Sequence, residues 1–296
     1  MLLSQSSRKM IVEKIKRPNQ MEAKKLDSNS EKYKLDVSVA TKNNARTIHQ
    51  CLTCIKQNLP VNRLIVVDGG SHDGTTEIAR AVGAEVITET GLLGKVRHVQ
   101  AEACTTDWII IVDSDVYVYP DWWSRMNRYM TDDIAIAAPA LGDVSVPKSL
   151  AFYYDFMVHN VHRYGAIHFS NALVNRKTLL SCVALLNNVH AGEDGVFATY
   201  ANEIGKRVVT VREYHLMYHD TAFAQAMVKT HIRSGQSMRM LGQWKGLKRV
   251  MKVLRSNVMN YIHYARSRRS PCAKLFIYII YLWILLAFGF ALGEST

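Results

Sequence analysis

The chain has 296 residues, of which 48% are hydrophobic and 21% are charged, with 37 lysines and arginines against 25 aspartates and glutamates. This length suits one large α/β domain with a sizeable core, and the composition excludes collagen, a coiled coil, wholesale disorder and a disulfide-built miniprotein. The positive excess is local, because residues 1–220 hold 25 basic and 24 acidic side chains whereas residues 221–293 hold 12 basic and no acidic ones.

The N-terminal segment, residues 1–34, is rich in Lys and Ser and lacks the apolar stretch of a signal peptide, so it is expected to be a flexible basic arm. The five cysteines are scattered and odd in number, which fits a reducing cytoplasm. Cys51 and Cys54 form a lone CxxC pair inside a predicted helix, a setting that disfavours a metal or redox role.

Residues 35–112 alternate between segments with strand and helix character. Strands are expected over 35–40, 63–67, 85–88 and 108–112, and helices over 45–57, 75–82 and 95–103. This alternation predicts an α/β fold with a doubly wound, mostly parallel sheet. Ligands of such sheets bind beyond the carboxyl ends of the strands, where polar residues of this chain gather.

Acidic residues follow two of these strands. Asp113 and Asp115 come directly after the fourth strand, and two carboxylates so close together repel each other unless a cation joins them. A hard divalent ion shared with phosphate groups is one solution, and a helix cap or turn is the structural alternative. Asp68 opens a Gly-rich turn that matches neither the Walker nor the dinucleotide pattern, which disfavours ATPase and dehydrogenase functions.

Four segments occur in order along the chain: VSVATKNNA, VVDGGSHDGT, GLLGKVRHVQAEACTTDWIIIVDSDVYVYPDWW and, later, Gly192-Glu193-Asp194-Gly195. Together they resemble a family 2 glycosyltransferase with the GT-A fold. The resemblance covers roughly residues 35–220 and implies a GT-A catalytic domain over that range, with the activity of a hexosyltransferase. The first loop departs from the family pattern at Lys42, where an apolar residue or Tyr is commoner.

The resemblance also implies roles for individual residues. The donor nucleotide would lie against Thr41, Asn43, Asp68, Lys95, Arg97 and Asp113. Asp113 and Asp115 would hold Mn²⁺ or Mg²⁺, with His219 completing the metal site, and Asp194 would be the catalytic base. Glu193, His231 and Arg233 are candidates for the acceptor or phosphate side.

The chemistry of glycosyl transfer agrees with these residue types. Displacement of a nucleoside diphosphate at an anomeric carbon develops negative charge on the leaving phosphate, which a divalent cation stabilises, and a hydroxyl acceptor needs a carboxylate to take its proton. A single displacement inverts the configuration. Two structural alternatives stay open, since Glu193 and Asp194 can cap the following helix and His219 can be solvated or packed in a core.

The C-terminal part combines charge with apolar surface. Residues 221–274 are expected to form basic amphipathic helices in the headgroup plane of an anionic membrane, and the uncharged run 275–292, roughly 27 Å long as a helix, is expected to span or insert into the bilayer. The positive-inside rule then places the catalytic domain in the cytoplasm. A buried core helix is the alternative for 275–292, and nucleic acid, as the rival anion, is disfavoured because no nucleic-acid-binding motif accompanies the charge.

A membrane-docking tail suggests a lipid-borne acceptor. Polyprenyl-phosphate sugar synthases are similar to the first half of the chain, but their phosphate acceptor is already ionised and needs no base. The Gly192–Gly195 motif therefore favours a hydroxyl of a lipid-linked saccharide or polysaccharide. A nucleotidyltransferase and a catalytically inactive membrane scaffold remain the alternatives from other classes.

Overall fold

The computed structural model describes residues 33–139, 153, 156, 167–189, 191–211, 217–219, 228, 231–234, 236, 243–268 and 273–292. The predicted basic arm lies outside this part of the chain except for its last two residues.

The centre of the molecule is a seven-stranded sheet in the order β3-β2-β1-β4-β7-β6-β8. Its strands, in chain order, are β1 (Leu35–Thr41), β2 (Val61–Asp68), β3 (Glu85–Thr88), β4 (Trp108–Asp113), β6 (Ile134–Pro139), β7 (Asn171–Asn175) and β8 (Arg207–Val211). Only β7 runs against its neighbours, whereas β1 to β4 form one parallel block and β6 pairs with β8 in parallel. The predicted mostly parallel α/β sheet is confirmed, and it is completed by segments far beyond the four predicted strands.

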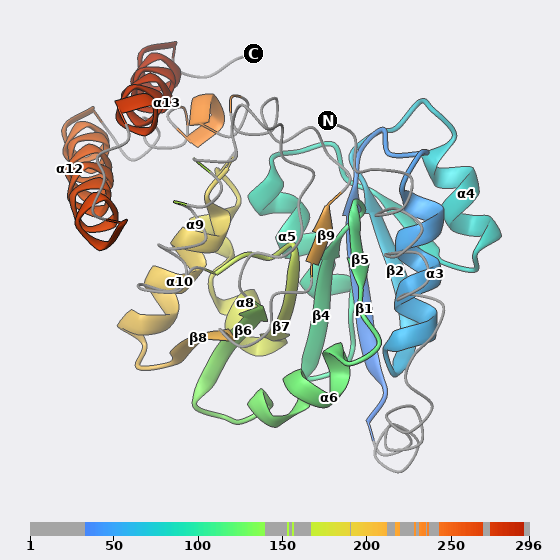
Figure 1. The fold of residues 1–296 in the computed structure, drawn as a ribbon. Coiled ribbons are helices and arrows are strands. Elements are labelled where there is room, and N and C mark those ends of the chain that lie inside the picture. The colour runs from blue at the N-terminus through green and yellow to red at the C-terminus, as the bar shows by residue number, and fades with distance from the viewer. Residues whose placement is uncertain are drawn as a thin grey trace.

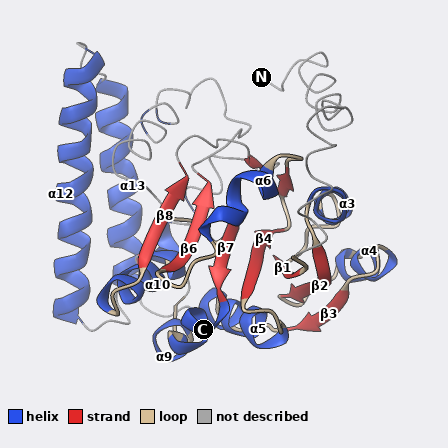
Figure 2. Ribbon diagram, turned by 90° about the horizontal axis from the view of Figure 1, so that it is seen from below, coloured by secondary structure: helices blue, strands red, loops and turns tan. Residues whose placement is uncertain are grey.

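Helices cover both faces of this sheet (Figures 1 and 2). They are α3 (Ile48–Asn58), α4 (Thr75–Ala81), α5 (Leu93–Ala103), α6 (Trp122–Met126), α8 (Arg176–Ser181), α9 (Val183–Leu186) and α10 (Glu193–Glu203), with a 3-10 turn at Asn127–Tyr129. One core layer packs α3, α4 and α6 on the sheet, and the other packs α5 and α8 to α10 on the opposite face. Strand β4 is buried on both faces, and its continuous aliphatic run explains why it sits in the middle.

A second, two-stranded sheet lies over the main one. It pairs β5 (Val116–Val118) with β9 (Met217–His219) in antiparallel fashion, and Figure 1 shows it in front of β4 and β1. Because β5 begins three residues after β4 ends, this ribbon ties a distant part of the chain to the carboxyl end of β4.

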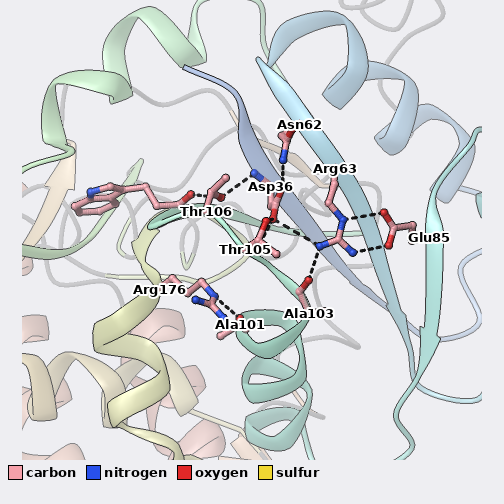
Figure 3. Close-up of polar contacts among 10 residues, drawn as sticks. Asp36, Asn62, Arg63, Glu85, Ala101, Ala103, Thr105, Thr106 and Arg176 are labelled. Atoms are coloured by element: carbon pink, nitrogen blue, oxygen red, sulfur yellow. Dashed lines mark hydrogen bonds and ion pairs between the residues drawn. The ribbon is translucent and has the colours of Figure 1, made fainter. Parts of the chain in front are cut away.

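The amino ends of the strands carry a buried polar network around Asp36 (Figure 3). The Asp36 carboxylate is fully buried and accepts hydrogen bonds from the Thr105 backbone N–H at 2.6 Å, the Thr105 hydroxyl at 2.9 Å and the Asn62 amide at 2.8 Å. Burial by itself raises the pKa of Asp36, but these hydrogen bonds outweigh it and lower the pKa below its ordinary value. The network therefore holds β1 to its neighbours at the edge opposite the predicted site.

Two long helices follow the α/β body. Helix α12 (Gln243–Arg268) and helix α13 (Ala273–Leu292) lie side by side, and both ribbon views place them beyond β8 and away from β1 to β3 (Figures 1 and 2). Their contact is aromatic and aliphatic, with Tyr264 of α12 and Leu275, Ile279 and Leu282 of α13 buried against Tyr153 and Phe156. Gly289 is in close contact with the backbone of Ile232, where an added Cβ would lie 2.0 Å from the carbonyl oxygen, so a larger residue would not fit there.

Candidate active site

The predicted donor-side residues meet at the carboxyl edge of the parallel block. Strand register places Thr41 opposite Asp68 and Ala40 opposite Asp113, so the ends of β1, β2 and β4 coincide. Asp115 follows two residues later in the turn that leads into β5. The structure thus brings together the residues that were predicted from three separate segments of the sequence.

Hydrogen bonds connect the loop after β1 to the loop after β2. Asn43 adopts a left-handed φ of 53°, donates its backbone N–H to Ser71 Oγ at 2.8 Å and accepts from the His72 N–H at 3.0 Å through its side chain. The Asn44 amide donates to Ser114 Oγ at 2.6 Å, which extends the network to the turn after β4. The Ala45 N–H also donates to the Asp73 carboxylate at 3.0 Å, and α3 begins at Ile48 rather than at the predicted residue 45. These hydrogen bonds connect the loops that follow β1, β2 and β4.

Asp68 is buried and organises its own turn. Its carboxylate accepts from the backbone N–H groups of Gly70 at 3.1 Å and Ser71 at 2.9 Å, and from the Ser71 hydroxyl. Gly70 has a φ of 81°, a left-handed conformation that favours glycine. Asp68 therefore shapes the loop on which the resemblance places the nucleotide.

Arg97 occupies the centre of the acidic cluster. Its guanidinium donates from Nη2 to Asp113 Oδ1 at 3.0 Å, from Nε to Glu193 Oε1 at 3.2 Å and from Nη1 to Gln100 Oε1 at 3.1 Å. Burial lowers the pKa of Arg97, but the adjacent carboxylates of Asp113 and Glu193 outweigh burial and raise it. Arg97 was predicted to contact the nucleotide or its phosphates, and the structure instead directs it at protein carboxylates, with only 2% of the residue exposed.

Glu193 and Asp194 open helix α10 beside this arginine. Burial raises the pKa of Glu193 to about 7, with Arg97 opposing the shift, and burial likewise raises the pKa of Asp194. Asp194 accepts from the Gly195 N–H at 2.7 Å, and its other oxygen lies 3.8 Å from Nδ1 of His168. A half-buried carboxylate with a raised pKa has the properties expected of a general base.

Strand pairing brings the backbone of His219 close to that of Asp115, two of the residues predicted to bind the metal. Val116 is the register partner of His219 in the β5–β9 ribbon, which puts His219 beside the residue that follows Asp115. Among the described side chains, which exclude that of His219, no group of three or more His, Cys, Asp and Glu could hold a metal ion. The donor set still fits a divalent ion, because hard cations commonly use one or two carboxylates and take their remaining ligands from water and substrate phosphates. Asp113 suits this use, since its side chain is 33% exposed although Arg97 holds one oxygen.

The remaining predicted residues are more dispersed. Lys95 lies in the first turn of α5, half-buried, with Nζ 3.4 Å from Nδ1 of His98. His231 and Arg233 flank Ile232, whose backbone contacts Gly289 of α13, so this segment lies against the C-terminal helix. Its neighbourhood is therefore the α12–α13 side of the molecule.

Several residues near the site were not predicted from the sequence. Gln100 binds Arg97, Phe169 packs under the guanidinium with its ring centroid 5.3 Å away, and His168 approaches Asp194. At the same edge, the Thr41 hydroxyl and the Asn171 amide are buried without a hydrogen-bond partner.

Comparison with protein families gives one match of consequence. The model described as Glycosyl transferase family 2 matches residues 36–188, which is more than half of the chain. An uncharacterized glycosyltransferase of Rickettsia bellii is 24% identical over 212 residues, covering 69% of this chain and 66% of that protein. Another from Rickettsia felis is 23% identical over 222 residues, covering 69% and 68%. The chain thus spans about two thirds of the length of these relatives.

Solved structures of glucosyl-3-phosphoglycerate synthase from Mycobacterium tuberculosis share the fold. The complex with phosphoglyceric acid has a TM-score of 0.52 at 16% identity, and the match covers 76% of this chain and 84% of that one. The complex with Mn²⁺, uridine diphosphate and glucosyl-3-phosphoglycerate has a TM-score of 0.52 at 17% identity, with the same coverage. At these identities the likeness concerns the fold alone.

Proposed function

Because the chain belongs to glycosyl transferase family 2, we propose that it transfers a sugar from a nucleoside-diphosphate sugar to a hydroxyl group. One observation supports this most strongly: Asp113, at the end of β4, and Glu193, which precedes Asp194 at the start of α10, bind one buried guanidinium at the carboxyl edge of the sheet. A carboxylate at the end of a strand and another at the start of a nearby helix can contact the donor and the acceptor of one reaction.

The proposed reaction is a single displacement at the anomeric carbon. The acceptor oxygen forms the new glycosidic bond as the bond from the anomeric carbon to the diphosphate oxygen breaks, and the configuration inverts. Asp194 takes the acceptor proton, and the nucleoside diphosphate leaves with the bonding electron pair. Asp113 and Asp115, with His219, would hold Mn²⁺ or Mg²⁺, which when bound stabilises the charge on the leaving diphosphate. Thr41, Asn43 and Lys95 would line the nucleotide, and the buried Asp68 would shape the loop beside it.

Turnover of a donor panel tests this function. The purified full chain is incubated with Mn²⁺ and each of several uridine and guanosine diphosphate sugars, and the released nucleoside diphosphate is measured with and without lipid extract as the acceptor source. A fold neighbour solved with Mn²⁺ and uridine diphosphate makes uridine donors the first choice. We expect release with one donor class, and no release with any donor would refute the proposal.

A polyprenyl-phosphate sugar synthase is the competing function. Its acceptor is an ionised phosphate, which needs no base, whereas the half-buried Asp194, whose pKa is raised by burial, is suited to deprotonating a hydroxyl. Assays with defined acceptors separate the two functions. Transfer to polyprenyl phosphate that continues in Asp194→Asn supports the synthase. Transfer to a hydroxyl acceptor that occurs in the wild type and is lost in Asp194→Asn supports Asp194 as the base.

The α12–α13 pair supports a membrane location. Residues 273–291 are the one described helix long and apolar enough to cross a bilayer. Ile277, Tyr281, Ile284 and Phe288 form an exposed stripe on α13, opposite the face that packs on α12, and α12 exposes Lys248, Lys252 and Arg255. An apolar stripe beside exposed cations fits an anionic lipid surface with the α/β body on the cytoplasmic side. The free thiols of Cys51, Cys54, Cys104 and Cys182 agree with a reducing compartment.

Flotation with lipid vesicles tests the membrane proposal. Full-length protein should float with vesicles containing an anionic lipid, and the Lys248→Glu/Lys252→Glu/Arg255→Glu variant should lose most of that binding because its charge is reversed. Replacement of the surface pair Asp133 and Arg207 by alanine is the control, since these residues lie on the α/β body. Equal flotation of the charge-reversed variant would refute docking through this face.

A further inference from the structure

Arg97 joins two parts of the site that are far apart in the sequence. Asp113 terminates β4 on the proposed donor side, and Glu193 begins α10 on the proposed acceptor side, 96 residues from Arg97. Each carboxylate is held by a different nitrogen of the same guanidinium, at 3.0 Å and 3.2 Å. Loss of either carboxylate therefore removes one of the contacts that hold the cation against the other.

The surroundings of Arg97 leave its guanidinium little freedom. Gln100, one turn along the same helix, accepts from a third nitrogen at 3.1 Å, and the Phe169 ring packs against the guanidinium face. The planar fork of an arginine can satisfy several acceptors at fixed angles, which the point charge of a lysine cannot. With only 2% of the residue exposed, Arg97 offers almost no surface to a diphosphate.

We infer that Arg97 is a positioning residue that couples the donor side of the site to the acceptor side, without touching the donor itself. It holds the Asp113 carboxylate in place for the metal and the donor, and it anchors the first turn of α10, which carries Asp194. The inference rests on the proposed function. Its consequence is that a change at Glu193, on the acceptor side, alters binding of the donor on the other side.

Helix packing adds a second path between the same two regions. The Gly94 N–H, in the first turn of α5, donates to the Val189 carbonyl at 3.0 Å, and a Cβ on Gly94 would lie 1.9 Å from the Leu186 carbonyl oxygen. The start of the helix that carries Arg97 is thus in direct contact with the segment that leads into α10. The two elements that carry Arg97 and Glu193 are therefore packed against each other near both residues.

Donor binding measured by calorimetry tests the coupling. The full-length protein is titrated with the nucleotide sugar that supports turnover, in Mn²⁺, for the wild type, Glu193→Gln and Glu193→Ala. Gln keeps an oxygen that can accept from Arg97 Nε, whereas Ala does not. We expect Glu193→Ala to weaken donor binding about tenfold, within the usual range for coupled sites, and Glu193→Gln to change it less than about threefold.

Variants at Arg97 and a distant arginine complete the experiment. Arg97→Lys should weaken donor binding about as much as Glu193→Ala, and Arg97→Lys combined with Glu193→Ala should add little further, because both remove one connection. Arg63→Met is the matched control: Arg63 forms a paired fork with Glu85 at the opposite edge, and its loss should lower the melting temperature without changing donor affinity.

Each result bears on the inference. Donor affinity that is unchanged in Glu193→Ala overturns the coupling. A double variant whose loss of affinity equals the product of the two single losses also overturns it, because Arg97 would then contact the donor directly. A loss of thermal stability alone in both Arg97→Lys and Glu193→Ala, with wild-type affinity, would mean a purely structural role and also overturn it. Failure of the wild type to bind any nucleotide sugar refutes the proposed function instead, so the two failures are distinguishable.

Discussion

Substitution of Asp194 by Asn separates the two roles that this residue can have. In the structure, Asp194 Oδ1 accepts from the Gly195 N–H at 2.7 Å and so satisfies a first-turn donor of α10. An asparagine oxygen can accept the same bond, but an amide cannot take a proton from a hydroxyl. We therefore expect Asp194→Asn to keep the fold and to lower kcat by about 10²- to 10⁴-fold, the usual contribution of a general base.

Asp194→Ala provides the comparison because it removes the hydrogen bond as well. Loss of a helix-terminal acceptor costs about 1 kcal/mol, which corresponds to roughly 2–4 °C in Tm for a domain of this size. Both variants should lose activity equally, whereas only the alanine variant should melt earlier. Asp133→Asn, at an exposed ion pair with Arg207, controls for the loss of one surface charge.

Differential scanning fluorimetry and steady-state kinetics on the same preparations give the answer. The wild-type rate should also fall on the acid side at a pH above that expected for an ordinary aspartate, because burial raises the pKa of Asp194 and the base must be ionised to act. Retention of more than about a tenth of kcat in Asp194→Asn would show that Asp194 only caps the helix.

Three further predictions concern the metal, the buried network and helix packing. Excess chelator should abolish turnover and added Mn²⁺ should restore it, and Asp115→Asn should need more Mn²⁺ for half-maximal rate; turnover in chelator would contradict the metal site. Asp36→Asn should destabilise the fold by about 3 kcal/mol at neutral pH, since the amide group meets donors from Thr105. The pKa of Asp36 is lower in the folded state than its unfolded value of about 3.9. The ionised carboxylate therefore stabilises the fold above that unfolded pKa, and this stabilisation is lost as the pH falls through the folded-state pKa. The Tm difference between Asp36→Asn and wild type should shrink below about pH 4, and a difference that stays constant with pH would refute this. Gly94→Ala should lower the free energy of unfolding by about 1–3 kcal/mol, because the added methyl group overpacks against Leu186. Gly195→Ala, whose added methyl group would meet nothing within 4 Å, should melt no earlier than wild type. A Tm of Gly94→Ala equal to that of Gly195→Ala would contradict the close packing.

Local pattern was enough to predict the parallel block of the fold. The continuous apolar run of β4 can only be buried, and strand ends followed by Asp68 and Asp113 had to meet at one edge once the strands were parallel. Antiparallel β7 and the β5–β9 ribbon were not predicted, because their pairing depends on long-range contacts across more than 50 residues. Strands β5 and β9, of three residues each, also carry too little periodicity to be recognised.

In the candidate site, too, residue types could be predicted from the sequence, whereas contacts between distant residues could not. Residue types at Asp113, Asp115 and Asp194 suggested acid and metal chemistry, and the structure brings Asp113 and Glu193, the residue before Asp194, to the same guanidinium of Arg97. The contacts of Arg97 were not predicted, because nothing in a helix sequence reveals that an arginine faces a carboxylate 96 residues away instead of the solvent. His168 lacked a signal for a similar reason, since its relation to Asp194 depends on the fold bringing β7 and α10 together.

Calorimetric titration with nucleotide sugars tests most directly whether these carboxylates form one donor site. In the presence of Mn²⁺, the wild type and Asp194→Asn should bind the same nucleoside-diphosphate sugar with similar affinity, and Asp115→Asn should bind it at least tenfold more weakly. If no nucleotide sugar binds to the wild type, or if Asp115→Asn binds as tightly as the wild type, the acidic edge of the sheet is not the donor site.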